Sequence, residues 1–146
     1  MDSLRTKNKI YLRVDKDEEI LTSILNICQC ESIRSATFHG IGACCEAVTA
    51  TYLPDRDDFL DHSKKRMLEL ISLDGNITHD EDMKLFVHAH ALFSFLNNDG
   101  KIEYFGGHLK SATVGYTAEI VIDPVESDDI GRMVDPVTGI TVWKLS

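Results

Sequence analysis

Residues 84–95 read KLFVHAHALFSF, and residues 101–109, shortly after them, read KIEYFGGHL. The turn signal Asn97-Asn98-Asp99-Gly100 lies between these two apolar runs, which predicts two antiparallel strands joined as a β-hairpin. Because side chains two residues apart on a strand share a face, His88 and His90 should point the same way. Their face also carries Phe86, Leu92 and Ser94. The opposite face is uncharged and is predicted to face the core: Leu85, Val87, Ala89, Ala91, Phe93 and Phe95.

The two histidines on one strand face form a candidate metal site. Their backbone positions should lie about 6.5–7 Å apart, and two imidazoles can close that span around one metal with bonds of about 2.0–2.1 Å. His108 follows Gly106 and Gly107 and is the candidate third ligand. Three neutral nitrogens suit zinc, and also iron or nickel, and leave a fourth position open. The alternative is that core hydrogen bonds satisfy the histidines.

Length and composition indicate one domain, 1–146, because 146 residues with 43% hydrophobic content can bury a core without disulfides. The net charge of -9 argues against a surface built to bind phosphate backbones. The sequence contains no apolar run of about 20 residues and no signal peptide, so a cytoplasmic protein without membrane contact is expected. In that reducing compartment the four cysteines should be free thiols.

The elements before the hairpin are expected to be short. Residues 10–14 should form a first strand, followed by a helix of about four turns that Asp15 caps, with Glu18 completing a capping box. Gly40 and Gly42 are expected to make a bulged turn between two strands. Residues 61–66 are expected to be a polar connection that ends in a solvated basic run, Lys64-Lys65-Arg66.

The second half of the chain is expected to supply more strands. Residues 67–73 should form a strand that residues 74–78 turn or bulge, and residues 114–122 should form a long alternating strand. Residues 127–129 should be acidic and exposed, and residues 132–143 should make a turn and a last short strand. The predicted fold class is therefore α+β, with a mostly antiparallel sheet and one main helix packed on it.

Several segments together resemble a known family. They are Ser35-Ala36-Thr37-Phe38-His39-Gly40-Ile41-Gly42-Ala43, Leu68-Glu69-Leu70-Ile71-Ser72-Leu73-Asp74-Gly75-Asn76-Ile77, His88-Ala89-His90-Ala91, Asp99-Gly100, Gly106-Gly107-His108-Leu109 and Thr117-Ala118-Glu119-Ile120-Val121-Ile122. In this order they resemble the plants-and-prokaryotes-conserved (PPC) domain, in its free-standing prokaryotic form. The resemblance covers a core of about 10–123, with an extension at 124–146, and implies an α+β homotrimer.

A partner is also needed on physical grounds, because one helix can cover only one face of a sheet. The remaining apolar side chains would form a patch larger than monomers normally expose, and closed symmetry would bury it: Phe86, Leu92, Tyr104 and Tyr116. The histidine site should then lie close to a subunit boundary.

Two functions stay open. The first is a trimeric, metal-binding regulatory or interaction module that meets other proteins, such as transcription factors. In plants this domain follows AT-hooks that bind the minor groove through a Gly-Arg-Pro core, which this sequence lacks, and prokaryotic members are called DNA-binding by analogy. Direct DNA binding should be weak or absent. The alternative is a small metal-dependent hydrolase, with Glu69, Glu46 or Glu119 as the unplaced general base. A glutamate inside an apolar run, as at Glu69, is more simply an ion-paired structural residue.

Overall fold

The computed structural model describes residues 1–56, 58–125 and 130–145, so the predicted acidic segment 127–129 lies outside the described residues. The chain forms one helix and eight strands within this part. In chain order they are β1 (Asp2–Arg5), β2 (Ile10–Asp15), α1 (Ile20–Cys30), β3 (Ala36–Leu53), β4 (Asp58–His79), β5 (Leu85–Leu96), β6 (Ile102–Pro124), β7 (Gly131–Val134) and β8 (Thr141–Lys144). The predicted α+β class, a mostly antiparallel sheet with one main helix, is confirmed, although that helix has 11 residues and is shorter than the four turns expected.

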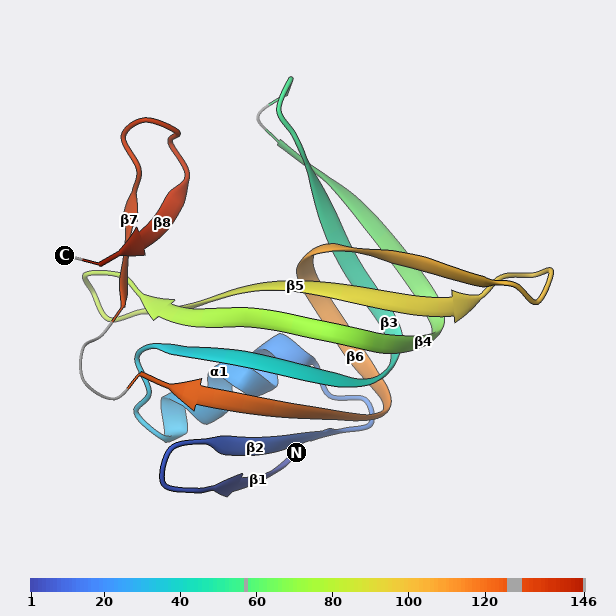
Figure 1. The fold of residues 1–146 in the computed structure, drawn as a ribbon, viewed down its shortest axis with the longest axis horizontal. Coiled ribbons are helices and arrows are strands. Elements are labelled where there is room, and N and C mark those ends of the chain that lie inside the picture. The colour runs from blue at the N-terminus through green and yellow to red at the C-terminus, as the bar shows by residue number, and fades with distance from the viewer. Residues whose placement is uncertain (57, 126–129, 146) are drawn as a thin grey trace.

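The strands pair in the order β1-β2-β6-β3-β4-β7-β8, and β5 pairs with both β4 and β6. Since β4 and β6 also flank β3, these four long strands pair in a closed circuit. All pairings are antiparallel except the short contact between β4 and β7. Helix α1 lies across one face of the strands, and the β3–β4 and β7–β8 hairpins project away from the body (Figure 1). The helix of the described chain is too short to span a membrane.

The helix begins later than predicted. Its N-cap is Glu19, whose carboxylate accepts from the backbone amides of Leu21 and Thr22 at 3.1 and 2.7 Å. Asp15 is the last residue of β2, so its predicted role as the cap is wrong. Its backbone amide nevertheless donates to the Glu18 carboxylate at 2.8 Å. The Ala112 amide of β6 also donates to the Glu19 carboxylate, at 3.0 Å, and this bond attaches the helix start to the sheet.

The sequence predicted two strands joined by a turn at Gly40 and Gly42. Both glycines instead lie within the single strand β3. The predicted bulge is present, because the pairing of β3 with β4 shifts register between Gly40 and Gly42, and again between Cys44 and Glu46. The predicted turn is wrong, since β3 bends but runs on as one strand to Leu53 (Figure 1). A bulge bends a strand without reversing it. The bends let one strand belong first to the body and then to a projecting arm.

The predicted polar connection at residues 61–66 is also strand. It pairs with the second half of β3, from Glu46 opposite Lys65 to Leu53 opposite Asp58. We call these paired segments, residues 46–53 and 58–65, the arm; residues 46–50 of the arm also pair with β6. Residues 58–65 lie outside the core on both faces of β4, so polar residues are tolerated on each face and the apolar alternation that signals a strand is missing. The predicted turn or bulge at residues 74–78 is wrong as well, because β4 runs on to His79 and its pairing stays in register over these residues.

The core lies between α1 and the inward faces of the strands. The predicted core face of β5 is confirmed, since Ala89, Ala91, Phe93 and Phe95 are buried and Leu85 and Val87 are half-buried against them. In place of one last strand the chain forms a hairpin of two strands, β7 and β8. The Asp135 amide donates to the Ile140 carbonyl across the hairpin loop. The cysteines are free, although only Cys28 and Cys44 are fully buried.

Candidate metal centre

The β5–β6 hairpin has the predicted architecture. The Asn97 amide donates to the Lys101 carbonyl at 2.8 Å and closes the turn. The resulting register sets His90 directly opposite His108. Gly107 has a φ of +144°, a conformation that side chains rarely adopt, and a Cβ there would meet the Ala50 carbonyl oxygen at 2.8 Å. Glycine therefore allows β6 to pass close to β3 while it presents His108 beside β5.

The three predicted histidines come together on the outer face of this hairpin. Their ring centroids are 5.4 Å apart for His88 and His90, 5.1 Å for His88 and His108, and 5.7 Å for His90 and His108. One nitrogen of each ring lies within 4.8 Å of one nitrogen of each of the others. We call these residues the triad. Their predicted convergence is found, and their role as metal ligands stays a prediction.

The charge state of the triad suits a metal. Partial desolvation lowers the pKa of His88, although its ring is partly exposed, and neighbouring His90 and Arg132 lower it further. Desolvation likewise lowers the pKa of His108, with His88, His90 and Lys110 acting in the same direction. Lowered pKa values keep imidazole neutral, and only a neutral nitrogen binds a metal.

The alternative of histidines held in the core does not match the structure. Within the described part of the chain, none of the three rings makes a hydrogen bond, and His88 and His90 are exposed. Three imidazole nitrogens on a rigid sheet fit a divalent metal with an open position. The group can therefore hold a metal ion, and a bound metal would supply Lewis acidity at that position.

Aromatic and cationic side chains, most of which the sequence did not reveal, surround the triad. The Phe59 ring of the arm lies 5.5 Å from the His108 ring, and Tyr52 lies 5.4 Å from Phe59. At the other end, the Arg132 guanidinium lies 4.4 Å from the centre of the Phe86 ring, which is next to His88 on the same strand face. Phe86 was predicted on this face, but no local pattern marks Phe59, Tyr52 or Arg132, because the arm and the β7–β8 hairpin reach the site only through the tertiary fold.

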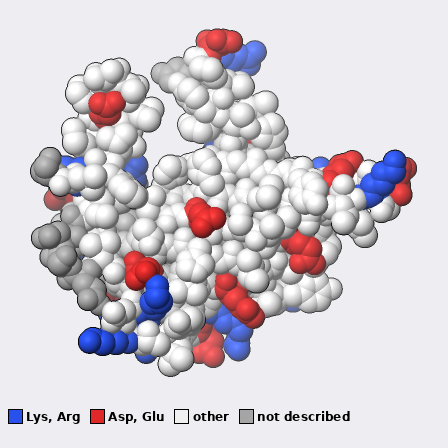
Figure 2. Space-filling view, viewed as in Figure 1, with Lys and Arg blue, Asp and Glu red and all other residues white. Residues whose placement is uncertain are grey.

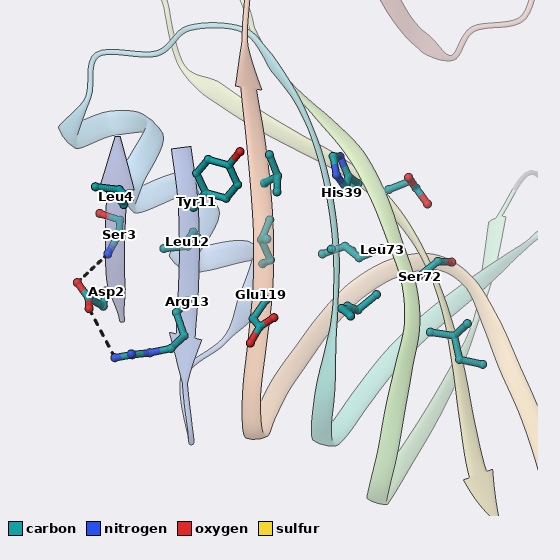
Figure 3. Close-up of a pocket in the computed structure, with 16 residues that line it drawn as sticks. Asp2, Ser3, Leu4, Tyr11, Leu12, Arg13, His39, Ser72, Leu73 and Glu119 are labelled. Atoms are coloured by element: carbon teal, nitrogen blue, oxygen red, sulfur yellow. Dashed lines mark hydrogen bonds and ion pairs between the residues drawn. The ribbon is translucent and has the colours of Figure 1, made fainter. Parts of the chain in front are cut away.

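The predicted supporting acids do not join the triad. Glu69 is exposed on β4 opposite Ser94, four residues beyond His90, so its place in the apolar run follows from strand alternation. Glu119 lies beside Arg13 in a groove on the outer face of the sheet (Figure 3). Glu46 pairs with Lys65 at 3.3 Å. None of the three supports the hydrolase alternative.

The acid that the register does bring to the triad is Asp74. It lies directly opposite His90 on β4 and, on its other side, opposite His39 on β3. It shares a hollow of about 340 Å³ with His88, His90 and the Trp143 ring of β8. Trp143 in turn donates to the Asn76 side-chain oxygen at 3.3 Å. Only the strand register reveals this neighbourhood, and the register depends on the β4–β5 turn, which carries no hairpin motif.

Comparison with known proteins identifies the family. The chain belongs to the Plants and Prokaryotes Conserved (PCC, also written PPC) domain family, whose model matches residues 1–126. The predicted family is therefore confirmed. No curated protein gave a significant match.

Solved structures agree with this assignment. A plant- and prokaryote-conserved protein from Pyrococcus horikoshii is 32% identical, with a TM-score of 0.79 over 98% of this chain and 93% of that one. A candidate DNA-binding protein from Ralstonia eutropha JMP134 is 26% identical, with a TM-score of 0.86 over 99% and 96%. A metal-containing protein from Archaeoglobus fulgidus is 27% identical, with a TM-score of 0.80 over 99% of both chains.

Proposed function

We propose that this protein is a trimeric, metal-binding interaction module whose metal is held by His88, His90 and His108. The observation that carries the proposal is the convergence of one nitrogen from each ring to within 4.8 Å of the others. The similar protein from Archaeoglobus fulgidus is described as metal-containing, which supports the same assignment. Zinc is the first choice for three imidazoles, and iron or nickel also suits them.

Elemental analysis of protein purified without an affinity tag tests the metal. About one metal per chain is expected, and His90→Ala should remove most of it, because two nitrogens hold a divalent ion far less tightly than three. His39→Ala is the matched control, since His39 is another exposed histidine, opposite Asp74 on the same face. Metal content that is negligible in the parent protein, or unchanged by His90→Ala, would refute the assignment.

The proposed trimer follows from apolar surface that the chain itself leaves uncovered. A groove of about 780 Å³ on the outer sheet face is lined by Leu4, Tyr11, Ile41 and Ile71, and Figure 3 shows Leu4 and Tyr11 on its wall. These four side chains are 65%, 49%, 57% and 42% exposed. A patch of this kind is characteristic of an interface, and closed symmetry buries it without leaving an open edge. The family resemblance supplies the number three.

Sedimentation should give three times the 16.4 kDa chain mass at micromolar concentration. Ile41→Glu should dissociate the assembly because it puts a carboxylate among the apolar side chains of the groove, whereas Ile41→Val should leave it intact. A monomeric parent protein would refute the trimer. A dimer would agree with burial of the apolar side chains of the groove, but it would contradict the three subunits that the family resemblance implies.

Direct DNA binding should contribute little. The net charge is -9, and on the face shown in Figure 2 the lysine and arginine side chains are scattered among acidic and uncharged ones. Without a clustered basic surface, few phosphates can be neutralised, so binding should be weak and indifferent to sequence. The module is instead proposed to act on other proteins, such as transcription factors. Submicromolar binding to duplex DNA at physiological salt, measured by anisotropy, would overturn this part of the proposal.

A further inference from the structure

The face of the arm that points away from the triad contains a second polar hollow, of about 380 Å³. Thr49 and Thr51 of β3 face it from one strand, and His62 and Lys64 of β4 face it from the other. By strand alternation, the neighbouring Tyr52 points to the opposite side, toward Phe59 and the triad. The residues that line the hollow are Thr49, Thr51, His62, Ser63, Lys64, Phe105 and Gly106. The hollow is therefore a separate feature from the metal centre.

The floor of this hollow contains an unsatisfied hydroxyl. Thr49 is 0% exposed, and its side-chain oxygen has no hydrogen-bond partner among the described residues. A buried polar group without a partner destabilises the folded state, so such groups are rare in proteins and often mark the place of a missing partner. A polar ligand in the hollow could supply that partner.

The cationic side chain that lines this hollow is Lys64. The Lys64 ammonium lies 4.2 Å from the centre of the Phe95 ring and 5.9 Å from that of Phe105. In the described chain Lys64 has no carboxylate partner, whereas Lys65 pairs with Glu46 at 3.3 Å. Aromatic faces hold a cation in place without neutralising it. Lys64 is thus available to a negatively charged ligand.

Hydrogen-bonding groups are already oriented beside this charge. The Thr51 hydroxyl and the His62 Nε2 are 3.1 Å apart and share a hydrogen bond. Asp99 and Glu103 line a neighbouring hollow, to which Lys64 also contributes. The side-chain amide of Asn97 holds Glu103 there, because it donates to the Glu103 carboxylate at 2.8 Å. The Thr49 hollow therefore combines hydroxyl groups, a ring nitrogen and a cation without a lining carboxylate.

We infer that this hollow binds a small oxyanion, either inorganic phosphate or the phosphate group of a phosphomonoester. Phosphate oxygens accept hydrogen bonds, and bonds to a charged acceptor are shorter and stronger than neutral ones. Lys64 supplies the charge, and the hydroxyls of Thr49 and Thr51 donate to the phosphate oxygens. The basic run 64–66, which the sequence suggested was only solvated, thereby acquires a specific role through Lys64.

Calorimetric titration of metal-free protein with inorganic phosphate, at constant ionic strength, tests this inference. Thr49→Val and Lys64→Gln should each weaken phosphate binding about tenfold or more, because each removes a bond to a charged ligand. Lys65→Gln is the matched control, since it makes the same change of charge on the opposite face of the arm. It should leave the affinity unchanged.

Two further measurements make the outcome decisive. Thr49→Val replaces an unpaired hydroxyl with a methyl group, so without phosphate its melting temperature should equal or exceed that of the parent protein. If that variant fails to fold, Lys64→Gln decides. His108→Ala should bind phosphate as the parent does, and loss of binding in it would assign the anion to the triad and overturn the inference. Equal affinities in Lys64→Gln and Lys65→Gln, or no measurable binding to the parent below about 10 mM, would also overturn it.

Discussion

Replacing Gly75 with alanine should destabilise the fold and disturb the triad together. Gly75 lies inside β4, with Phe38 of β3 opposite on one side and Ala89 of β5 on the other. A Cβ at this position would meet the tip of the Phe38 ring at 2.4 Å and the carbonyl oxygen of His88 at 2.5 Å. Both distances are far below van der Waals contact, so the neighbours must move.

Neither neighbour can move freely. The Phe38 side chain is 3% exposed and packed in the core, and the His88 carbonyl belongs to the backbone that positions a triad ring. Overpacking a well-packed site costs about 1–3 kcal/mol, and two simultaneous overlaps favour the upper end, about 3 kcal/mol of unfolding free energy. Because relief of the second overlap displaces the backbone of His88, the metal affinity of Gly75→Ala should fall as well.

Urea denaturation of metal-free protein at fixed concentration measures the first effect, and metal titration measures the second. Phe38→Leu removes the ring tip that the new Cβ would meet. The double variant Gly75→Ala/Phe38→Leu should therefore have an unfolding free energy about 1 kcal/mol higher than the sum of the two single changes predicts. Gly139→Ala is the control. A Cβ there would meet nothing within 4 Å, so its only cost is the backbone strain of an alanine at a φ of +73°. Gly75→Ala within about 0.5 kcal/mol of the parent protein would refute this account of the close approach.

Three other outcomes are expected. Burial raises the pKa of the Cys28 and Cys44 thiols to about 12, so a thiol reagent should label exposed Cys30 in the native protein, and label Cys28 and Cys44 only after unfolding. Glu19→Ala should cost about 2 kcal/mol of unfolding free energy, measured in urea, because it removes the helix cap and the bond from the Ala112 amide. Two triad histidines have a pKa lowered by folding, so the folded state takes up protons less readily than the unfolded state. The stability of metal-free protein should therefore be level above about pH 6.5 and fall as the pH drops below it, in thermal melts across that range.

The hairpin and its histidines could be predicted because their information is local. The alternation from Leu85 to Phe95 and the turn at residues 97–100 determine which side chains share a face, and the register of a tight hairpin then brings His108 opposite His90. The strands at residues 10–14, 67–73 and 114–122 were likewise predicted from their own local patterns. Local sequence patterns were therefore enough to predict both the core face of β5 and the residues of the candidate metal centre.

The length of the strands and the surroundings of the triad could not be predicted in this way. Residues 61–66 are polar because both faces of β4 lie largely outside the core there, so no periodicity marks them as strand. Asp74 and Phe59 reach the triad only through pairings between strands that are distant in sequence. Glycines such as Gly42 resemble turn residues, although here they allow bends and close approach within one continuous strand.

The strand order also has a consequence for how the chain folds during synthesis. Strand β2 pairs with the end of β6, Ile10 opposite Ile122, and β3 pairs with the same segment, Ala36 opposite Pro124. More than 80 residues separate the partners in each case, so closing these loops costs entropy before any contact offsets it. Until β6 has left the ribosome, β2 has only β1 beside it, and one edge of β3 stays open. The nascent chain should therefore expose unpaired strand edges through most of its synthesis, when chaperones protect such segments against aggregation.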